Sequence, residues 1–129
     1  PILKTIISME SPRMRVDKLV QVATAALEDI KAHDIRAFDV RKITSLYDTL
    51  IIASADSGRQ VRALARHVRD ALAAEGAAIL GVEGEAGGEW VLVDAGSLVV
   101  HVMQPAIRSY YNLEELWAPA ATRRARSAA

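Results

Sequence analysis

The sequence contains no cysteine, and this absence excludes several kinds of site at once. A disulfide framework, a thiol nucleophile and a thiolate zinc site all require that side chain. No apolar stretch approaches the roughly 20 residues that a membrane-spanning helix needs. Sixteen basic residues balance sixteen acidic ones, so the formal net charge is zero. This balance disfavours a protein that holds nucleic acid chiefly by neutralising phosphates.

The 129 residues correspond to a single folded domain. Apolar residues make up 51% and charged residues 25%, which is close to the average of proteins that bury a core. We expect residues 1–14 to form an N-terminal extension, residues 15–118 the folded domain, and residues 119–129 a disordered basic tail. No signal peptide is recognisable, and a reducing compartment fits the lack of cysteine, so we expect a cytoplasmic protein without a membrane anchor.

Apolar periodicity predicts two long helices. Apolar residues recur every three or four positions over residues 16–32, and Ser11 and Pro12 supply a cap and a first turn. Ser57 and Gln60 have the spacing of a capping box, and a second apolar stripe follows them until Gly76.

The remaining segments predict five strands and a C-terminal helix. The strand candidates are residues 35–40, 50–55, 78–82, 90–94 and 98–103. We expect the second of these to be central and the last three, separated by a loop at residues 81–88 and a tight turn at Ala95 and Gly96, to form a β-meander. Pro105 then begins a helix, and Asn112 with Glu115 repeats the capping-box spacing before a last turn through Trp117. The order αββαβββα predicts an α/β fold, an α+β sandwich with a mixed sheet of about five strands.

Residues that could perform catalysis are scattered along the chain. His33, His67 and His101 show no HxH or HExxH spacing, so we expect no metal site. The aspartates at strand ends form no D-x-D pair, and neither a phosphate-binding glycine loop nor a G-x-S-x-G turn occurs. We therefore expect no catalytic residue and no cofactor. His101 lies within an apolar strand, where it points either into a hydrogen-bonded niche of the core or outward at a partner.

Two groups of residues are candidates for binding. A basic stripe recurs on one face of the second helix, at Arg59, Arg62, Arg66 and Arg69. This stripe is either a solvated face or a local contact with phosphates or an acidic protein surface. Aromatic residues, which often anchor protein interfaces, gather in the last third of the chain at Trp90, Tyr110, Tyr111 and Trp117.

Several segments, in this order, resemble the hallmark series of the ribosomal silencing factor family, also called RsfS or Iojap. They are Glu83-Gly84, the run EWVLVD at residues 89–94, the run VVHV at residues 99–102, and the run RSYYNLEELW at residues 108–117. The resemblance extends upstream to about residue 16. It implies an αβ fold related to nucleotidyltransferases without their catalytic carboxylates. It also implies a protein that docks on the large ribosomal subunit through protein L fourteen, needs no cofactor, and sterically blocks joining of the small subunit when nutrients are scarce.

From this resemblance and from the alternation of side chains along strands we predict a partner-binding surface on the sheet and the C-terminal segment. Its residues are Glu83, Trp90, Asp94, His101, Arg108, Tyr110, Tyr111, Leu113, Leu116 and Trp117. The basic stripe then becomes a candidate for a local contact with rRNA, and a homodimer stays open as a further assembly. The alternative function is a nucleotide-binding or nucleotidyltransferase-like enzyme, which would require magnesium-dependent nucleotide binding.

Overall fold

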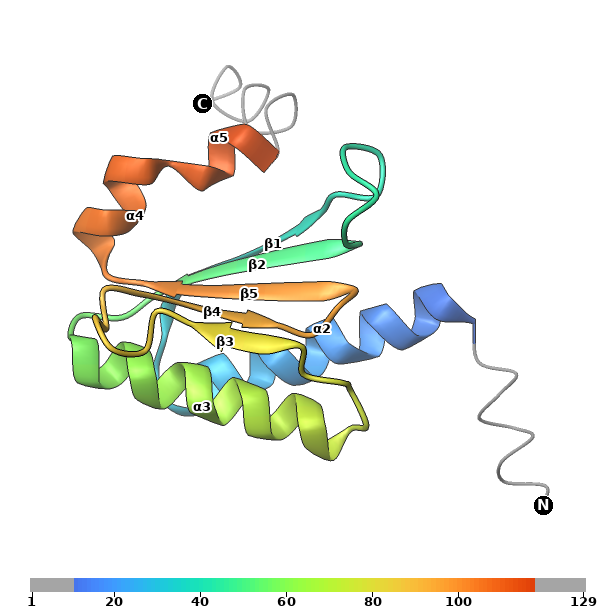
Figure 1. Cartoon of the computed structure of the whole chain (residues 1–129), viewed down its shortest axis with the longest axis horizontal. Helices are drawn as coiled ribbons and strands as arrows, with labels where there is room; N and C mark the ends of the chain where they lie inside the picture. Colours follow the sequence, from blue (N-terminus) through green and yellow to red (C-terminus); the bar gives the residue numbers. More distant parts are fainter. Residues whose placement is uncertain (1–10, 118–129) are drawn as a thin grey trace.

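The computed structural model describes residues 11–117. Nine elements follow one another along this part of the chain (Figure 1). They are α2 (Pro12–Asp29), β1 (His33–Asp39), β2 (Thr49–Ser54), α3 (Gly58–Ala74), β3 (Gly81–Glu83), β4 (Trp90–Asp94), β5 (Leu98–Met103), α4 (Pro105–Tyr111) and α5 (Leu113–Trp117). The predicted α+β class and element order are confirmed, with the C-terminal helix divided in two. The predicted tail and residues 1–10 of the predicted extension lie outside the described residues.

The five strands form one mixed sheet in the order β1-β2-β5-β4-β3. β2 and β5 are parallel, and the other neighbours are antiparallel. The last three strands therefore form the predicted β-meander. β2 is an interior strand, as expected, and all six of its residues are buried. The middle position belongs to β5, because the chain returns from α3 through the meander and places its last strand beside β2.

The predicted strand at residues 78–82 is wrong in its bounds, since β3 occupies Gly81–Glu83. Gly81 pairs with Asp94, the last residue of β4, so the partner strand ends there. At the other end, Gly84 has a φ of 90°, and a Cβ at this position would collide with the carbonyl oxygen of Trp90. This close approach, which only glycine permits, ends the strand and shortens the predicted loop.

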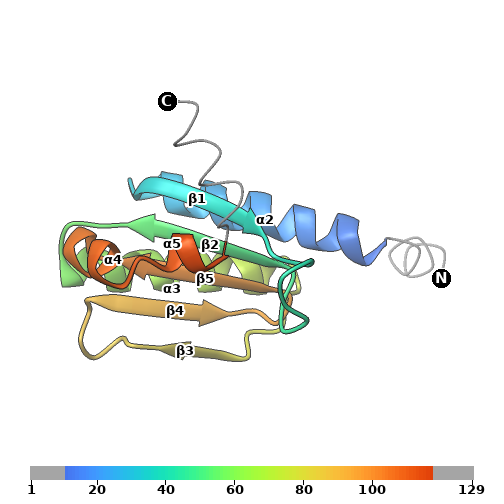
Figure 2. The same cartoon turned by 90° about the horizontal axis from the view of Figure 1, so that it is seen from above.

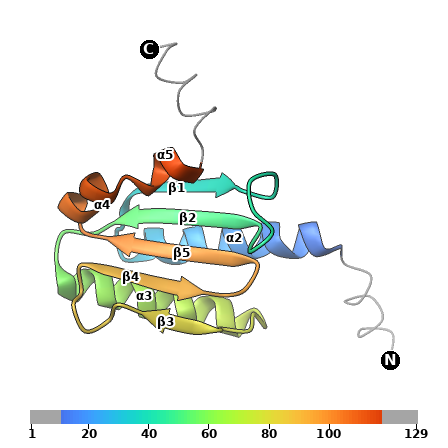
Figure 3. The same cartoon turned by 45° about the horizontal axis from the view of Figure 1, so that its top comes forward.

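The sheet has two unequally covered faces. α2 and α3 pack together on one face and bury its apolar side chains, including Ile51, Val93 and Val100 (Figures 1 and 3). On the other face, α4 and α5 pack over Leu50 and Ile52 of β2 and over β5. Seen from above (Figure 2), these two short helices leave β4 and β3 without a covering helix. Along β5, alternation sends Val100 and Val102 to the first face and Val99, His101 and Met103 to the second.

The helix starts agree with the sequence, with small differences. Ser11 accepts a hydrogen bond from the backbone N–H of Met14 (3.2 Å), and α2 begins at Pro12. Residues 12–14 therefore belong to this helix and not to the predicted extension. Ser57 accepts from the backbone N–H of Gln60 (3.1 Å). The Gln60 side chain accepts in turn from Asp56 (3.2 Å), so the capping box closes one residue earlier than its usual form.

Asn112 lies at the boundary between α4 and α5, where the last turn was predicted to begin. Asn112 adopts a left-handed conformation with φ 50° and ψ 51°, and its N–H donates to the carbonyl of Arg108, which ends α4. Asparagine tolerates this conformation better than most residues. The resulting bend turns the chain so that α5 follows α4 as a separate helix. Within residues 11–117, no helix is both long and apolar enough to cross a membrane.

Candidate partner-binding site

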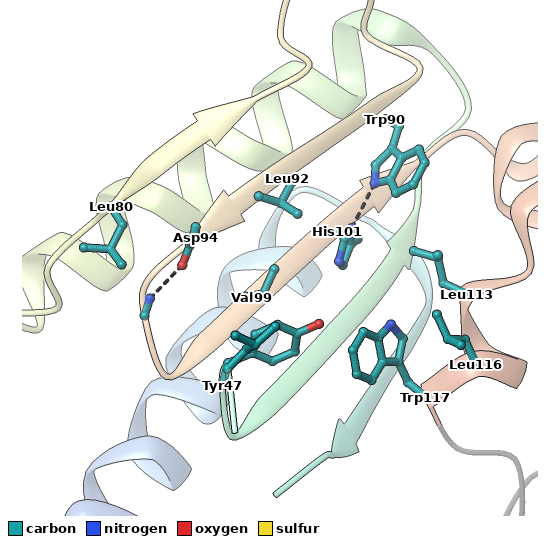
Figure 4. A pocket seen from close by; sticks show the side chains of 12 residues that line it. Tyr47, Leu80, Trp90, Leu92, Asp94, Val99, His101, Leu113, Leu116 and Trp117 are labelled. Atoms are coloured by element: carbon teal, nitrogen blue, oxygen red, sulfur yellow. Dashed lines mark hydrogen bonds between the residues drawn. The ribbon is translucent and has the colours of Figure 1, made fainter. Parts of the chain in front are cut away.

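A pocket of about 620 Å³ opens where α4 and α5 leave the sheet uncovered (Figure 4). β4 and β5 supply its floor, α5 supplies one wall, and the loop between β1 and β2 supplies another. We call it the aromatic pocket and define it by its lining residues, which are Leu46, Tyr47, Leu80, Trp90, Leu92, Asp94, Gly96, Val99, His101, Leu113, Leu116 and Trp117. Several of these are large exposed apolar side chains, such as Leu46 (77% exposed) and Leu80 (68%). Exposed apolar residues grouped in this way are typical of a binding surface.

The structure brings most of the predicted partner-binding residues together at this pocket. Trp90, Asp94 and His101 come from the floor, and the wall contributes Leu113, Leu116 and Trp117. Two further predicted residues extend the surface outward from Trp90. The ring of Tyr111 lies 5.0 Å from the Trp90 ring, and Tyr110 lies edge-on to Tyr111 at 5.1 Å. Both tyrosines are exposed, so the aromatic surface continues from the pocket along α4.

Glu83 lies outside the aromatic pocket, on its far side from α5. It lines a smaller hollow of about 300 Å³ together with Gly84, Trp90 and Leu92. The last two residues also line the aromatic pocket, so the two hollows share a rim. Glu83 therefore places a carboxylate at the edge of the predicted surface.

His101 is oriented by Trp90 on the neighbouring strand. The indole Nε1–H donates to Nδ1 of His101 at 2.9 Å. An acceptor at Nδ1 means that the neutral ring carries its proton on Nε2. The residue is 6% exposed, and burial lowers the pKa of His101 to about 4. His101 is thus neutral near pH 7. The sequence allowed this side chain to lie in a hydrogen-bonded niche or to point outward. It is hydrogen-bonded and nearly buried, and it also lines the pocket.

Two further aromatic rings and a carboxylate line the pocket (Figure 4). Tyr47 and Trp117 lie with ring centroids 5.5 Å apart. Burial, and after it the charge of Asp94, raise the pKa of the Tyr47 phenol. One oxygen of Asp94 accepts from the backbone N–H of Gly96 at 2.9 Å. No lysine or arginine is among the lining residues, so Asp94 supplies the only formal charge of the pocket near pH 7.

Sequence reasoning missed half of the pocket. Leu92 and Val99 could have been found from strand alternation, because each lies two positions from a predicted residue, Trp90 and His101 respectively. Leu46, Tyr47 and Leu80 have no such signal, since they come from loops whose place depends on the assembled sheet.

Arg108 is the predicted residue that points elsewhere. Its side chain is 10% exposed and forms an ion pair with Glu114, with Nε 2.7 Å from Oε1. Its Nη1 also donates to the Asp34 carbonyl (2.7 Å) and to the Ser54 hydroxyl (2.8 Å). Arg108 is therefore engaged inside the fold, and a direct contact with a partner would require these bonds to break.

The basic stripe lies on α3, across the sheet from the aromatic pocket. Arg59 and Arg66 are exposed, whereas Arg62 and Arg69 are partly buried. Arg69 pairs with Asp70 at 3.0 Å. The stripe and the pocket therefore face opposite sides of the molecule, and one flat partner cannot cover both.

The aspartates at strand ends have separate partners. Asp39 accepts from the backbone N–H of Arg41 at 3.1 Å, and this bond is the main cause that lowers the pKa of Asp39. Asp56 pairs with His33 at 2.9 Å. In the part of the chain that the structure describes, no three histidine, aspartate or glutamate side chains gather as metal ligands would.

Comparison with known proteins gives consistent matches. The profile of a family described as ribosomal silencing factor during starvation matches residues 13–128. The chain is similar to ribosomal silencing factor RsfS of Chromobacterium violaceum, with 52% identity over 104 residues that cover 81% of this chain and 85% of that protein. It is also similar to RsfS of Bacillus subtilis, with 40% identity over 107 residues, or 83% of this chain and 91% of that protein. A crystal structure of a Chromobacterium violaceum protein matches with a TM-score of 0.77 and 52% identity, covering 78% of this chain and 84% of that one.

Proposed function

Because the chain belongs to the ribosomal silencing factor family, whose members regulate translation in association with the ribosome, we propose that it binds the large ribosomal subunit through protein L fourteen and blocks joining of the small subunit. The mechanism is steric exclusion, in which the bound protein occupies space that the small subunit needs. It requires neither a cofactor nor catalysis. Translation falls under starvation as a result, and the site of action is the cytoplasm.

The observation that supports this proposal is the aromatic pocket. Interface hot spots are enriched in tryptophan and tyrosine that occupy well-packed positions. Trp90 is held from two sides, by its hydrogen bond to His101 and by its contact with Tyr111. A side chain that is already fixed loses little conformational freedom on binding, which favours affinity.

The chemistry of the pocket indicates what it accepts. Leu46, Leu92 and Leu116 offer apolar contacts, while Asp94 places a negative charge near the ring of Tyr47. A carboxylate next to aromatic faces favours a cationic side chain. We therefore expect L fourteen to present an apolar residue near a lysine or arginine.

Two further contacts belong to the proposal. The exposed Arg59 and Arg66 on α3 offer charge for rRNA phosphates. Two copies associate through exposed apolar residues before the ribosome is met, and a purely monomeric protein at high micromolar concentration in light scattering would contradict this association.

The test is co-sedimentation with separated ribosomal subunits, followed by a subunit-joining assay. The protein should sediment with large subunits, leave small subunits in the supernatant, and reduce formation of the joined ribosome in proportion to its occupancy. Equal recovery with both subunits, or occupancy without any effect on joining, would refute the proposal.

A further inference from the structure

An ion pair spans the bend between the two C-terminal helices. Arg108 of α4 and Glu114 of α5 lie on either side of Asn112, and their side chains are only 10% and 16% exposed. Nε and Oε1 are 2.7 Å apart, a short distance typical of a strong charge-assisted hydrogen bond.

The same two side chains also bind the sheet. Nη1 of Arg108 donates to the hydroxyl of Ser54, which is buried at the carboxyl end of β2, and to the carbonyl of Asp34 in β1. The second oxygen of Glu114 accepts from Arg36 of β1 at 3.1 Å. We call Arg108, Glu114 and Ser54 the latch, since their buried bonds connect α4 and α5 to the sheet, whereas Arg36 reaches Glu114 from the exposed side.

α5 is a short helix that depends on contacts with the rest of the fold. It has five residues, and neither α4 nor α5 contains a residue that is fully buried. A helix of one turn is not stable alone in water, because each new helix must first form a costly nucleus. Leu113 and Trp117 pack only partly against the core. The latch thus adds a largely buried polar attachment to these apolar contacts.

We propose that the latch positions the α5 wall of the aromatic pocket, so that Arg108 and Glu114 control partner binding without touching the partner. The proposal rests on the proposed function of the pocket. Leu113 directly precedes Glu114 and Trp117 lies about one helical turn after it, and both line the pocket, while Arg108 binds the Glu114 carboxylate. A shift of Glu114 therefore moves both wall residues at once.

The geometry requires an arginine. Arg108 donates in different directions from Nε and Nη1, and a planar guanidinium fork satisfies both at fixed angles. Lysine keeps the charge but offers a single ammonium on a flexible stem. Arg108→Lys should therefore loosen α5 while the rest of the fold stays intact.

The experiment combines amide hydrogen exchange with large-subunit binding for Arg108→Lys and Glu114→Gln. We expect exchange over residues 113–117 to accelerate roughly tenfold with α2 and α3 unchanged, and binding to weaken roughly tenfold. Arg36→Ala is the matched control, because Arg36 binds the same carboxylate from the exposed side. It should change binding by less than about threefold.

Each result decides between the alternatives. Wild-type binding by both latch variants, unchanged exchange in α5, or equally faster exchange in every helix would overturn the positioning role. If the wild-type protein itself does not bind large subunits, the proposed function fails separately. In that case amide hydrogen exchange of the two variants still tests the latch. Faster exchange confined to α5 would support the positioning role, and unchanged exchange in α5 would overturn it.

Discussion

The indole N–H of Trp90 on β4 donates to Nδ1 of His101 on β5, at 2.9 Å. The bond joins a partly exposed indole to a nearly buried imidazole that burial keeps neutral. Protonation of Nδ1 would remove the acceptor. The orientation of Trp90 therefore depends on the charge state of His101, and this dependence leads to the first prediction.

Stability should fall between pH 6.5 and 4 because of His101. The pKa is about 4 in the folded protein against 6.5 for an unperturbed histidine, so in this range the unfolded chain binds a proton that the native state does not. The contribution is complete above pH 6.5 and is lost as the pH falls to about 4, and the total loss of stability is about 3 kcal/mol. Urea unfolding of the wild type and of His101→Gln across this range measures it. An equally steep loss in the variant would contradict the assignment.

Gly84→Ala should destabilise the protein by at least about 2 kcal/mol. Its φ of 90° is unfavourable for alanine, and the added Cβ would collide with the Trp90 carbonyl. Gly87→Ala is the matched control from the same loop, since a Cβ there meets no atom within 4 Å. Denaturant unfolding should separate the two variants clearly, and similar midpoints for both would show that the turn tolerates a side chain.

Tyr111→Ala should weaken binding to the large subunit by about 2 kcal/mol while the thermal midpoint moves only a few degrees. Tyr111 is 53% exposed and contacts Trp90, so its removal costs the core little. Fluorescence-detected binding and a thermal melt measure the two effects. Full binding by the folded variant would remove this part of α4 from the proposed surface.

The double variant Arg59→Ala with Arg66→Ala should weaken binding to whole large subunits and make it less dependent on salt. Each lost phosphate contact reduces the slope of log affinity against log salt by roughly one. Binding to isolated protein L fourteen should not change, because α3 lies across the sheet from the aromatic pocket. Unchanged salt dependence would leave the basic stripe as a solvated face.

Local pattern was sufficient to predict much of this protein. Periodicity and capping residues identified α2 and α3, and alternation placed Trp90 and Asp94 on one face of β4. These properties depend on neighbours within a few positions, so they can be predicted before the fold is known. The β3 bounds were missed because they depend on where β4 ends, which is a pairing between distant segments.

The tertiary structure decided how the pocket is assembled. Tyr47 and Trp117 are far apart in sequence. Parallel pairing of β2 with β5 places the loop before β2 beside the start of β5, and the two rings meet because α4 and α5 run back over the sheet from the end of β5. The inward direction of Arg108 has the same origin, since its partners Ser54 and Asp34 come from other strands. Sequence alone determined which residue types were available for binding. Long-range packing decided which of them face a partner and which hold the others in place, because a side chain's partners are set by elements distant in the chain.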